Sequence, residues 1–148
     1  MRQRLPILFL RIVLGLYFLC GGLLVFLAPA QMGDARFAAA GLPWPHLLAT
    51  AGGSLELLGG VFLLINFYAG DAALLLAVTV LIQCITLRIP VLLGQPWGAL
   101  KPPSLESYGW LPFLHQARTD LLLLVALVGI TIDAGLILGR KRRWYQEP

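Results

Sequence analysis

The sequence predicts an all-α integral membrane protein that folds as a bundle of four transmembrane helices. Hydrophobic residues make up 59% of the chain and charged residues only 12%, a composition far from that of an average soluble domain. The apolar residues also fall in long uninterrupted runs, whereas a soluble helix would carry a polar stripe at the 3.6-residue period. We expect the 148 residues to form a single membrane domain.

Four of the apolar runs have roughly the 20 residues that a helix needs to cross the hydrocarbon core. The predicted spans are approximately residues 5–28, 46–66, 70–93 and 119–138. We expect the first to remain in the protein as a span, because it is longer than the core of a signal peptide and Arg11 interrupts it. Only a few residues join the second span to the third, which makes these two antiparallel neighbours.

The basic residues predict the orientation of the spans. Six of them lie at the chain ends, beside the first and fourth spans: Arg2, Arg4, Arg140, Lys141, Arg142 and Arg143. Only three lie in the two long loops at residues 29–45 and 94–118: Arg36, Lys101 and Arg118. Because cytoplasmic segments carry the excess of Lys and Arg, both termini are expected in the cytoplasm and both long loops outside. The charge lies beside the lipid bilayer and forms no basic stripe, which argues against a nucleic-acid partner.

Both long loops contain Trp or Tyr, including Trp44, Trp97, Tyr108 and Trp110. Such rings are common at the headgroup level, where the apolar body meets lipid and the polar tip meets water. They are either a belt that anchors the loops or a lid over the outer mouth of the bundle.

Ionisable residues inside the spans are the candidates for a functional site, because a charge in hydrocarbon is unfavourable unless it is paired or hydrated. Counted from the centre of each span, Glu56 falls near the midplane, with Arg11 about 9 Å and Asp133 about 6 Å toward the cytoplasm. We predict an intramembrane cluster of Arg11, Glu56 and Asp133, with Gln83 bonded into it. It is either an ion pair that fixes the helix register or a proton or ligand site.

Two further groups complete the predicted polar and packing residues. Arg88 and Asp120 have similar depth near the outer surface and are expected to form an ion pair there. Glycines at helical spacing share one face with Arg11 or Glu56 and predict close helix packing: Gly15, Gly22, Gly52, Gly59 and Gly60.

No motif of a soluble enzyme is present: the chain has no Ser-His-Asp order, P-loop or GxGxxG. The sequence therefore assigns no catalytic residue. The two cysteines, Cys20 and Cys84, have no CxxC spacing and fit ordinary packing positions within spans, with a redox or disulfide role as the alternative. His46 and His115 lack a third ligand, and we predict no metal site.

Several segments together resemble the DoxX family of small bacterial membrane proteins. They are Arg11-Ile-Val-Leu-Gly-Leu-Tyr-Phe in the first span, Phe37 with Gly41-Leu-Pro in the first loop, and Gly53-Ser-Leu-Glu-Leu-Leu-Gly-Gly in the second span. The resemblance covers roughly residues 5–93. It implies a four-helix protein of the bacterial inner membrane. For some relatives it also implies an association with respiratory or thiol-redox systems, including thiosulfate-to-quinone electron transfer and oxidant defence.

Two hypotheses about function follow. In the first, the chain is a subunit or scaffold of a membrane redox or oxidative-stress system, at most the membrane subunit of an oxidoreductase complex, with other membrane or redox proteins as partners. In the second, the bundle binds or transports a quinone or another small lipophile through Arg11 and Glu56, which requires a cavity beside Glu56. The sequence leaves the oligomeric state open.

Overall fold

The computed structural model describes residues 4–97, 100–102 and 108–135. These residues form six helices: α1 (Arg4–Leu27), α2 (Pro29–Met32), α3 (Asp34–Ala39), α4 (Pro45–Leu64), α5 (Ala69–Leu93) and α6 (Trp110–Asp133). Among them, α1, α4, α5 and α6 are long and apolar enough to cross a membrane. The predicted fold class, an all-α membrane bundle with four spanning helices, is confirmed.

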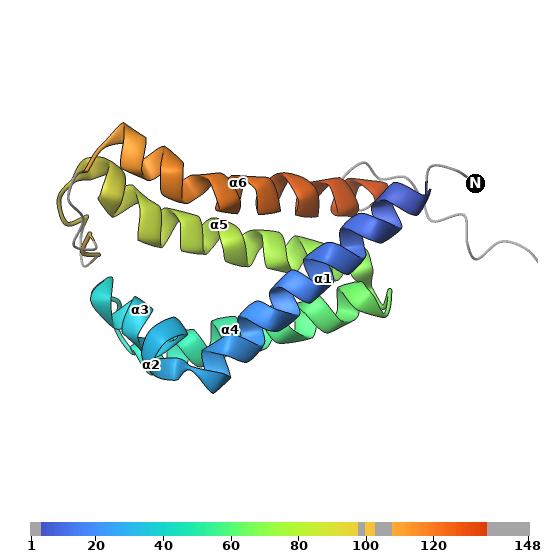
Figure 1. Ribbon diagram of the computed structural model, residues 1–148, viewed down its shortest axis with the longest axis horizontal. Helices are drawn as coiled ribbons and strands as arrows, with labels where there is room; N and C mark the ends of the chain where they lie inside the picture. The colour runs from blue at the N-terminus through green and yellow to red at the C-terminus, as the bar shows by residue number, and fades with distance from the viewer. Residues whose placement is uncertain (1–3, 98–99, 103–107, 136–148) are drawn as a thin grey trace, which may run out of the picture.

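The long helices pack as two pairs, α1 with α4 and α5 with α6 (Figure 1). A tight turn at residues 65–68 joins α4 to α5. We call this end of the bundle the terminal end, because α1 begins there and α6 ends there. The opposite end, at α2, α3 and the described residues 94–97, 100–102 and 108–109, is the loop end. The two pairs diverge toward the loop end, so the bundle has the outline of a wedge.

The hydrophobic core explains why the wedge is closed at the terminal end. Leu14 and Phe18 of α1, Leu63 of α4, Leu76 of α5 and Leu127 of α6 are buried in one cluster. Such a cluster contributes dispersion contacts, which hold helices together in lipid where the hydrophobic effect between helices is absent. No cluster of comparable size joins the two pairs at the loop end among the described residues.

The first long loop contributes α2, which follows the end of α1, and α3, which packs against the beginning of α4. Phe37 of α3 is buried against Val25 of α1 and Ala49 of α4. A hydrogen bond of 3.0 Å between His46 Nδ1 and Asp34 Oδ2 also ties α3 to α4. The loop is therefore packed on the bundle and forms part of its wall.

The boundaries of the fourth helix differ most from the predicted spans. α6 begins at Trp110 rather than near residue 119 and ends at Asp133, while residues 136–138 lie outside the described part. Gly109 starts the helix with a φ of 113°, which favours glycine. Pro112 is tolerated because it lies in the first turn, where its missing N–H has no helical partner to lose. Polar residues before position 120 predict a boundary there, but the helix contains them.

Candidate functional site

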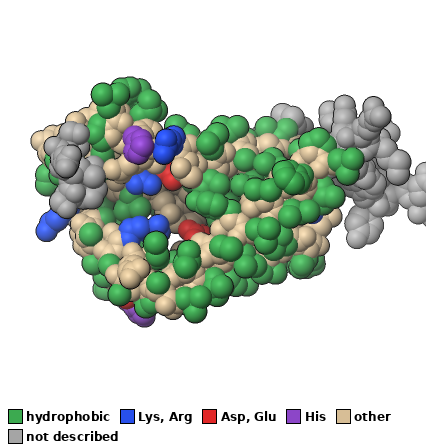
Figure 2. Space-filling model, in the orientation of Figure 1, with side chains coloured by type: hydrophobic (Ala, Val, Ile, Leu, Met, Phe, Trp, Pro, Cys, Tyr) green, Lys and Arg blue, Asp and Glu red, His purple; other side chains and the backbone are tan. Residues whose placement is uncertain are grey.

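A pocket of about 720 Å³ lies in the wedge between the two helix pairs, in the half of the bundle near the loop end. All six helices and Lys101 contribute to its lining. The space-filling view shows it as a hollow on the flank of the molecule, where acidic and basic side chains are visible among apolar ones (Figure 2). Its volume is within the range of roughly 300 to 1,000 Å³ that small-molecule sites occupy.

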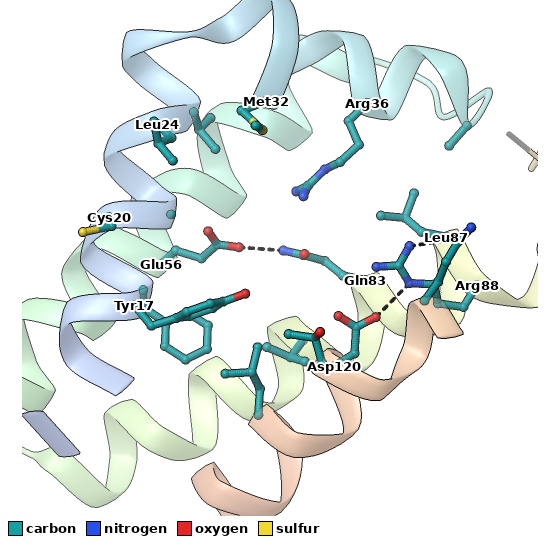
Figure 3. A pocket seen from close by; sticks show the side chains of 18 of the residues that line it. Tyr17, Cys20, Leu24, Met32, Arg36, Glu56, Gln83, Leu87, Arg88 and Asp120 are labelled. Carbon is teal, nitrogen blue, oxygen red and sulfur yellow. Dashed lines mark hydrogen bonds and ion pairs between the residues drawn. The ribbon is translucent and has the colours of Figure 1, made fainter. Parts of the chain in front are cut away.

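The inner part of the pocket contains a hydrogen bond between two spanning helices. Gln83 of α5 donates from Nε2 to Oε1 of Glu56 on α4, at 2.8 Å. Figure 3 shows both side chains reaching across the cavity toward each other, with the Tyr17 hydroxyl of α1 also pointing into it. The second carboxylate oxygen, Oε2, faces Gly21, where an added Cβ would be 3.2 Å away. Glu56 is thus half-buried within a span and has one amide donor.

A second polar group joins α5 to α6 beside the pocket. Arg88 donates from Nε to Oδ2 of Asp120 at 2.8 Å and from Nη1 to Oε1 of Gln116 at 3.1 Å. The structure therefore brings together the two residues expected to pair near the outer surface. Their side chains are 27% and 19% exposed, so solvent screens this pair less than a fully exposed one.

Two further basic residues line the pocket from the loop end. Arg36 of α3 lies with its Cζ 5.2 Å from the centre of the Phe37 ring, and its guanidinium points into the cavity (Figure 3). The backbone N–H of Lys101 donates to the Ala40 carbonyl at 2.8 Å, which ties this segment to the end of α3. Within the described ranges, neither Arg36 nor Lys101 forms an ion pair.

The predicted cluster of Arg11, Glu56 and Asp133 is not formed. Arg11 donates from Nη2 to the Leu63 carbonyl at 3.5 Å, and its buried Nε has no hydrogen-bond partner. Asp133 is exposed at the last position of α6. Of the predicted cluster, only Glu56 and Gln83 meet.

The register of α1 against α4 explains the error. Gly15 contacts Gly60 and Leu64, and Gly22 contacts Gly53 and Leu57. In this antiparallel register Glu56 lies at the level of Gly21, ten residues along α1 from Arg11, a separation of about 15 Å. Equal depth of Arg11 and Glu56 would require the centres of α1 and α4 to be level, but α4 is displaced toward the loop end.

Four of the five predicted packing glycines lie at close helix contacts. A Cβ at Gly15, Gly22, Gly59 or Gly60 would come within 2.7 Å of a neighbouring helix. The prediction for Gly52 is wrong, because nothing lies within 4 Å of its Cβ position. The next residue, Gly53, makes the contact instead, with Val25 Cγ1 2.8 Å from its Cβ position.

Several polar residues of the pocket carry no signal in the sequence that marks them as site residues. Tyr17 belongs to an apolar-looking run, and Gln116 stands in a segment predicted as loop. From the sequence, Arg36 and Lys101 indicate only the orientation of the spans. The loop aromatics for which a belt or a lid was predicted are exposed and do not line the pocket: Trp44, Trp97, Tyr108 and Trp110. Among the described residues, no three His, Cys, Asp or Glu side chains lie close enough to hold a metal ion.

Comparisons with known proteins give the family context of this site. Residues 7–88 match the sequence model of the DoxX family, a range that contains Tyr17, Glu56 and Gln83. An uncharacterized membrane protein of Mycobacterium tuberculosis is 31% identical over 119 residues, which cover 80% of this chain and 69% of the relative. No solved structure matches the chain.

Proposed function

Since this chain belongs to the DoxX family of membrane proteins, we propose that it binds a small lipophilic molecule with a polar head group in the pocket beside Glu56. The observation that carries this proposal is the pocket itself, about 720 Å³ in volume and lined by Glu56 and Gln83. A cavity at Glu56 is what the ligand-binding hypothesis required. A scaffold would need only packed helices and an outer surface for its partners.

The lining of the pocket supports this choice of ligand. Apolar side chains such as Phe18, Val80 and Leu123 form part of the wall and suit a hydrocarbon body. The polar side chains of the lining, among them Arg36 at the loop end and Gln83 in the inner part, supply hydrogen-bonding groups for a polar head. A quinone has this general shape and is one candidate. The role as a subunit of a redox or oxidative-stress system stays a prediction, which co-purification of partner proteins would test.

We further propose that the protein lies in the bacterial inner membrane with both termini in the cytoplasm. The basic residues at the chain ends support this orientation, although Arg2 and residues 140–143 lie outside the described part of the structure. Reporter fusions test it: a periplasm-active phosphatase fused after residue 102 should be active, and one fused after residue 148 inactive. The reverse pattern would overturn the orientation and would place the pocket mouth on the cytoplasmic side.

The binding proposal predicts a saturable ligand signal at the rim of the pocket. Cys20 stands on the α1 edge of the pocket, and its free, exposed thiol points away from the cavity (Figure 3), so in a Cys84→Ala variant a single polarity-sensitive fluorophore there reports from the rim of the pocket. We expect decyl-ubiquinone or dodecyl phosphate to shift its emission saturably in lipid nanodiscs, because a ligand in the pocket changes the polarity beside the α1 edge that carries the dye.

The matched control places the same fluorophore on the lipid-facing surface of α6. Val125 is 73% exposed and does not line the pocket, so a Val125→Cys variant that also carries Cys20→Ala and Cys84→Ala should report only partitioning into lipid. The binding proposal fails if neither compound gives a saturable change at Cys20, or if the Val125 site responds in the same way.

A further inference from the structure

We propose that the ligand of this pocket is an anionic amphiphile, with a phosphate or carboxylate head held by Arg36 and Lys101 and a hydrocarbon chain that leaves between α1 and α6. This inference rests on the proposed function and narrows it to a ligand class. It follows from the distribution of charge around the pocket and from the side on which the pocket is open.

The charges around the pocket do not balance. Three cations, Arg36, Arg88 and Lys101, line it together with two carboxylates, Glu56 and Asp120. Asp120 is bonded to Arg88, and Glu56 accepts its hydrogen bond from Gln83. Arg36 and Lys101 therefore remain without a carboxylate partner in the described ranges.

The two unpaired cations lie where an anionic head group is expected. Arg36 belongs to α3 and Lys101 is tied to Ala40 at the end of α3, so both enter the pocket from the loop end. Basic side chains at this level of a membrane protein meet the phosphates and carboxylates of the leaflet. A guanidinium binds such an anion through charge-assisted hydrogen bonds, in bidentate fashion where the geometry allows.

The carboxylate of Glu56, in the inner part of the pocket, determines at which end the head group of the ligand lies. Glu56 lies in the middle of α4 and faces Gly21 of α1, well inside the span. Its negative charge disfavours an anion in the inner part of the pocket, whereas Arg36 and Lys101 favour one at the loop end. The head is therefore retained at the loop end, and the chain needs an apolar route from there.

The open flank between α1 and α6 provides that route. Tyr17, Cys20 and Leu24 of α1 line the pocket and are also exposed, as is Thr119 of α6. The hollow is accordingly visible from the side of the bundle in Figure 2, in the direction that faces lipid. An amphiphile can enter sideways from the leaflet at the loop end without passing through water.

Ligand binding to the Cys20-labelled protein tests the inference with three compounds. Dodecyl phosphate carries both the anion and the chain, decyl-ubiquinone has a neutral head, and inorganic phosphate has no chain. We expect dodecyl phosphate to bind most tightly. The double substitution Arg36→Gln with Lys101→Gln should weaken it by about tenfold or more, since two charge-assisted contacts are lost. Binding of decyl-ubiquinone should change little, and inorganic phosphate should give no response.

Arg118→Gln is the matched control, because Arg118 is an exposed basic residue of α6 that does not line the pocket. It should leave the affinity for dodecyl phosphate unchanged. Arg36 and Lys101 are also exposed, so equal melting temperatures of the double variant and the parent protein are expected, and a charge-preserving Arg36→Lys should retain most of the binding.

Each contrary outcome identifies what is wrong. If decyl-ubiquinone binds as tightly as dodecyl phosphate and the double substitution affects neither, the anionic class is wrong while ligand binding in the pocket stands. If inorganic phosphate binds as tightly as dodecyl phosphate, the site serves a soluble anion and the amphiphile is excluded. If no compound binds, the proposed function fails with the inference.

Discussion

Gly60→Ala is expected to destabilise the protein by about 2 to 3 kcal/mol and to move α1 away from α4. A Cβ at Gly60 would be 2.6 Å from the Leu19 backbone nitrogen and 2.8 Å from the Gly15 carbonyl oxygen. Both atoms belong to the backbone of α1, so no side-chain rotation can relieve the contact. Gly22→Ala should behave alike, because its Cβ would be 2.6 Å from the Gly53 carbonyl oxygen and the Leu57 nitrogen.

The environment makes this interface sensitive. Between helices in lipid, association depends on close packing and interhelical hydrogen bonds, and small residues allow the backbones to approach. Forcing α1 and α4 apart lengthens every contact along the pair. Because α1 carries Tyr17 and Cys20 into the pocket wall, ligand binding should weaken together with stability.

Gly52→Ala is the matched control, on the same helix and one turn from Glu56. Nothing lies within 4 Å of its Cβ position, so the substitution should be neutral or stabilise α4 by up to about 1 kcal/mol through helix propensity. Reversible unfolding of the three variants in mixed detergent micelles measures the difference. Equal stability of Gly60→Ala and Gly52→Ala would show that the close approach of α1 and α4 does not hold the bundle together.

The sequence predicts the parts of this structure that depend on local pattern. Uninterrupted apolar runs identify the four spanning helices because the bilayer fixes the length of a spanning segment. Glycines spaced along Glu56's face of α4 also point to the α1 contact, since Gly60 is one helical turn from Glu56. The prediction for Gly52 is wrong because helical spacing defines a face about as wide as two residues. Only the packing of α1 on α4 shows that Gly53 makes the contact.

The candidate site depends on features that local pattern does not contain. Whether Arg11 reaches Glu56 depends on how far α4 is displaced along α1. Backbone contacts at Gly15 and Gly22 set this displacement. Arg36 and Lys101 reach the pocket only because long loops fold back on the bundle, with Phe37 buried and Lys101 bonded to Ala40. In contrast, the ion pair of Arg88 with Asp120 can be predicted from the sequence, because both residues are charged and lie near the same end of adjacent helices.

Gln83→Leu is expected to destabilise the protein by about 2 kcal/mol, because it leaves the Glu56 carboxylate inside the span without its amide donor. A hydrogen bond to a charged group contributes more than one between neutral groups, and the remaining partner keeps the penalty of desolvation. Glu56→Gln should have a smaller effect, below about 1 kcal/mol, since the amide oxygen still accepts from Gln83. The two substitutions therefore separate loss of the hydrogen bond from loss of charge.

A double-mutant cycle gives the decisive measurement. Glu56→Leu with Gln83→Leu should be less destabilising than the sum of the two single substitutions by about 1 to 2 kcal/mol, because the second change removes the group that the first left unpaired. Thr79→Val is the control on the same helix: its hydroxyl donates to the Leu75 carbonyl of its own helix at 3.0 Å, and its loss should change stability little. Additive effects of Glu56→Leu and Gln83→Leu would mean that these side chains do not interact in the membrane, and the polar centre of the pocket would then have to be assigned to other residues.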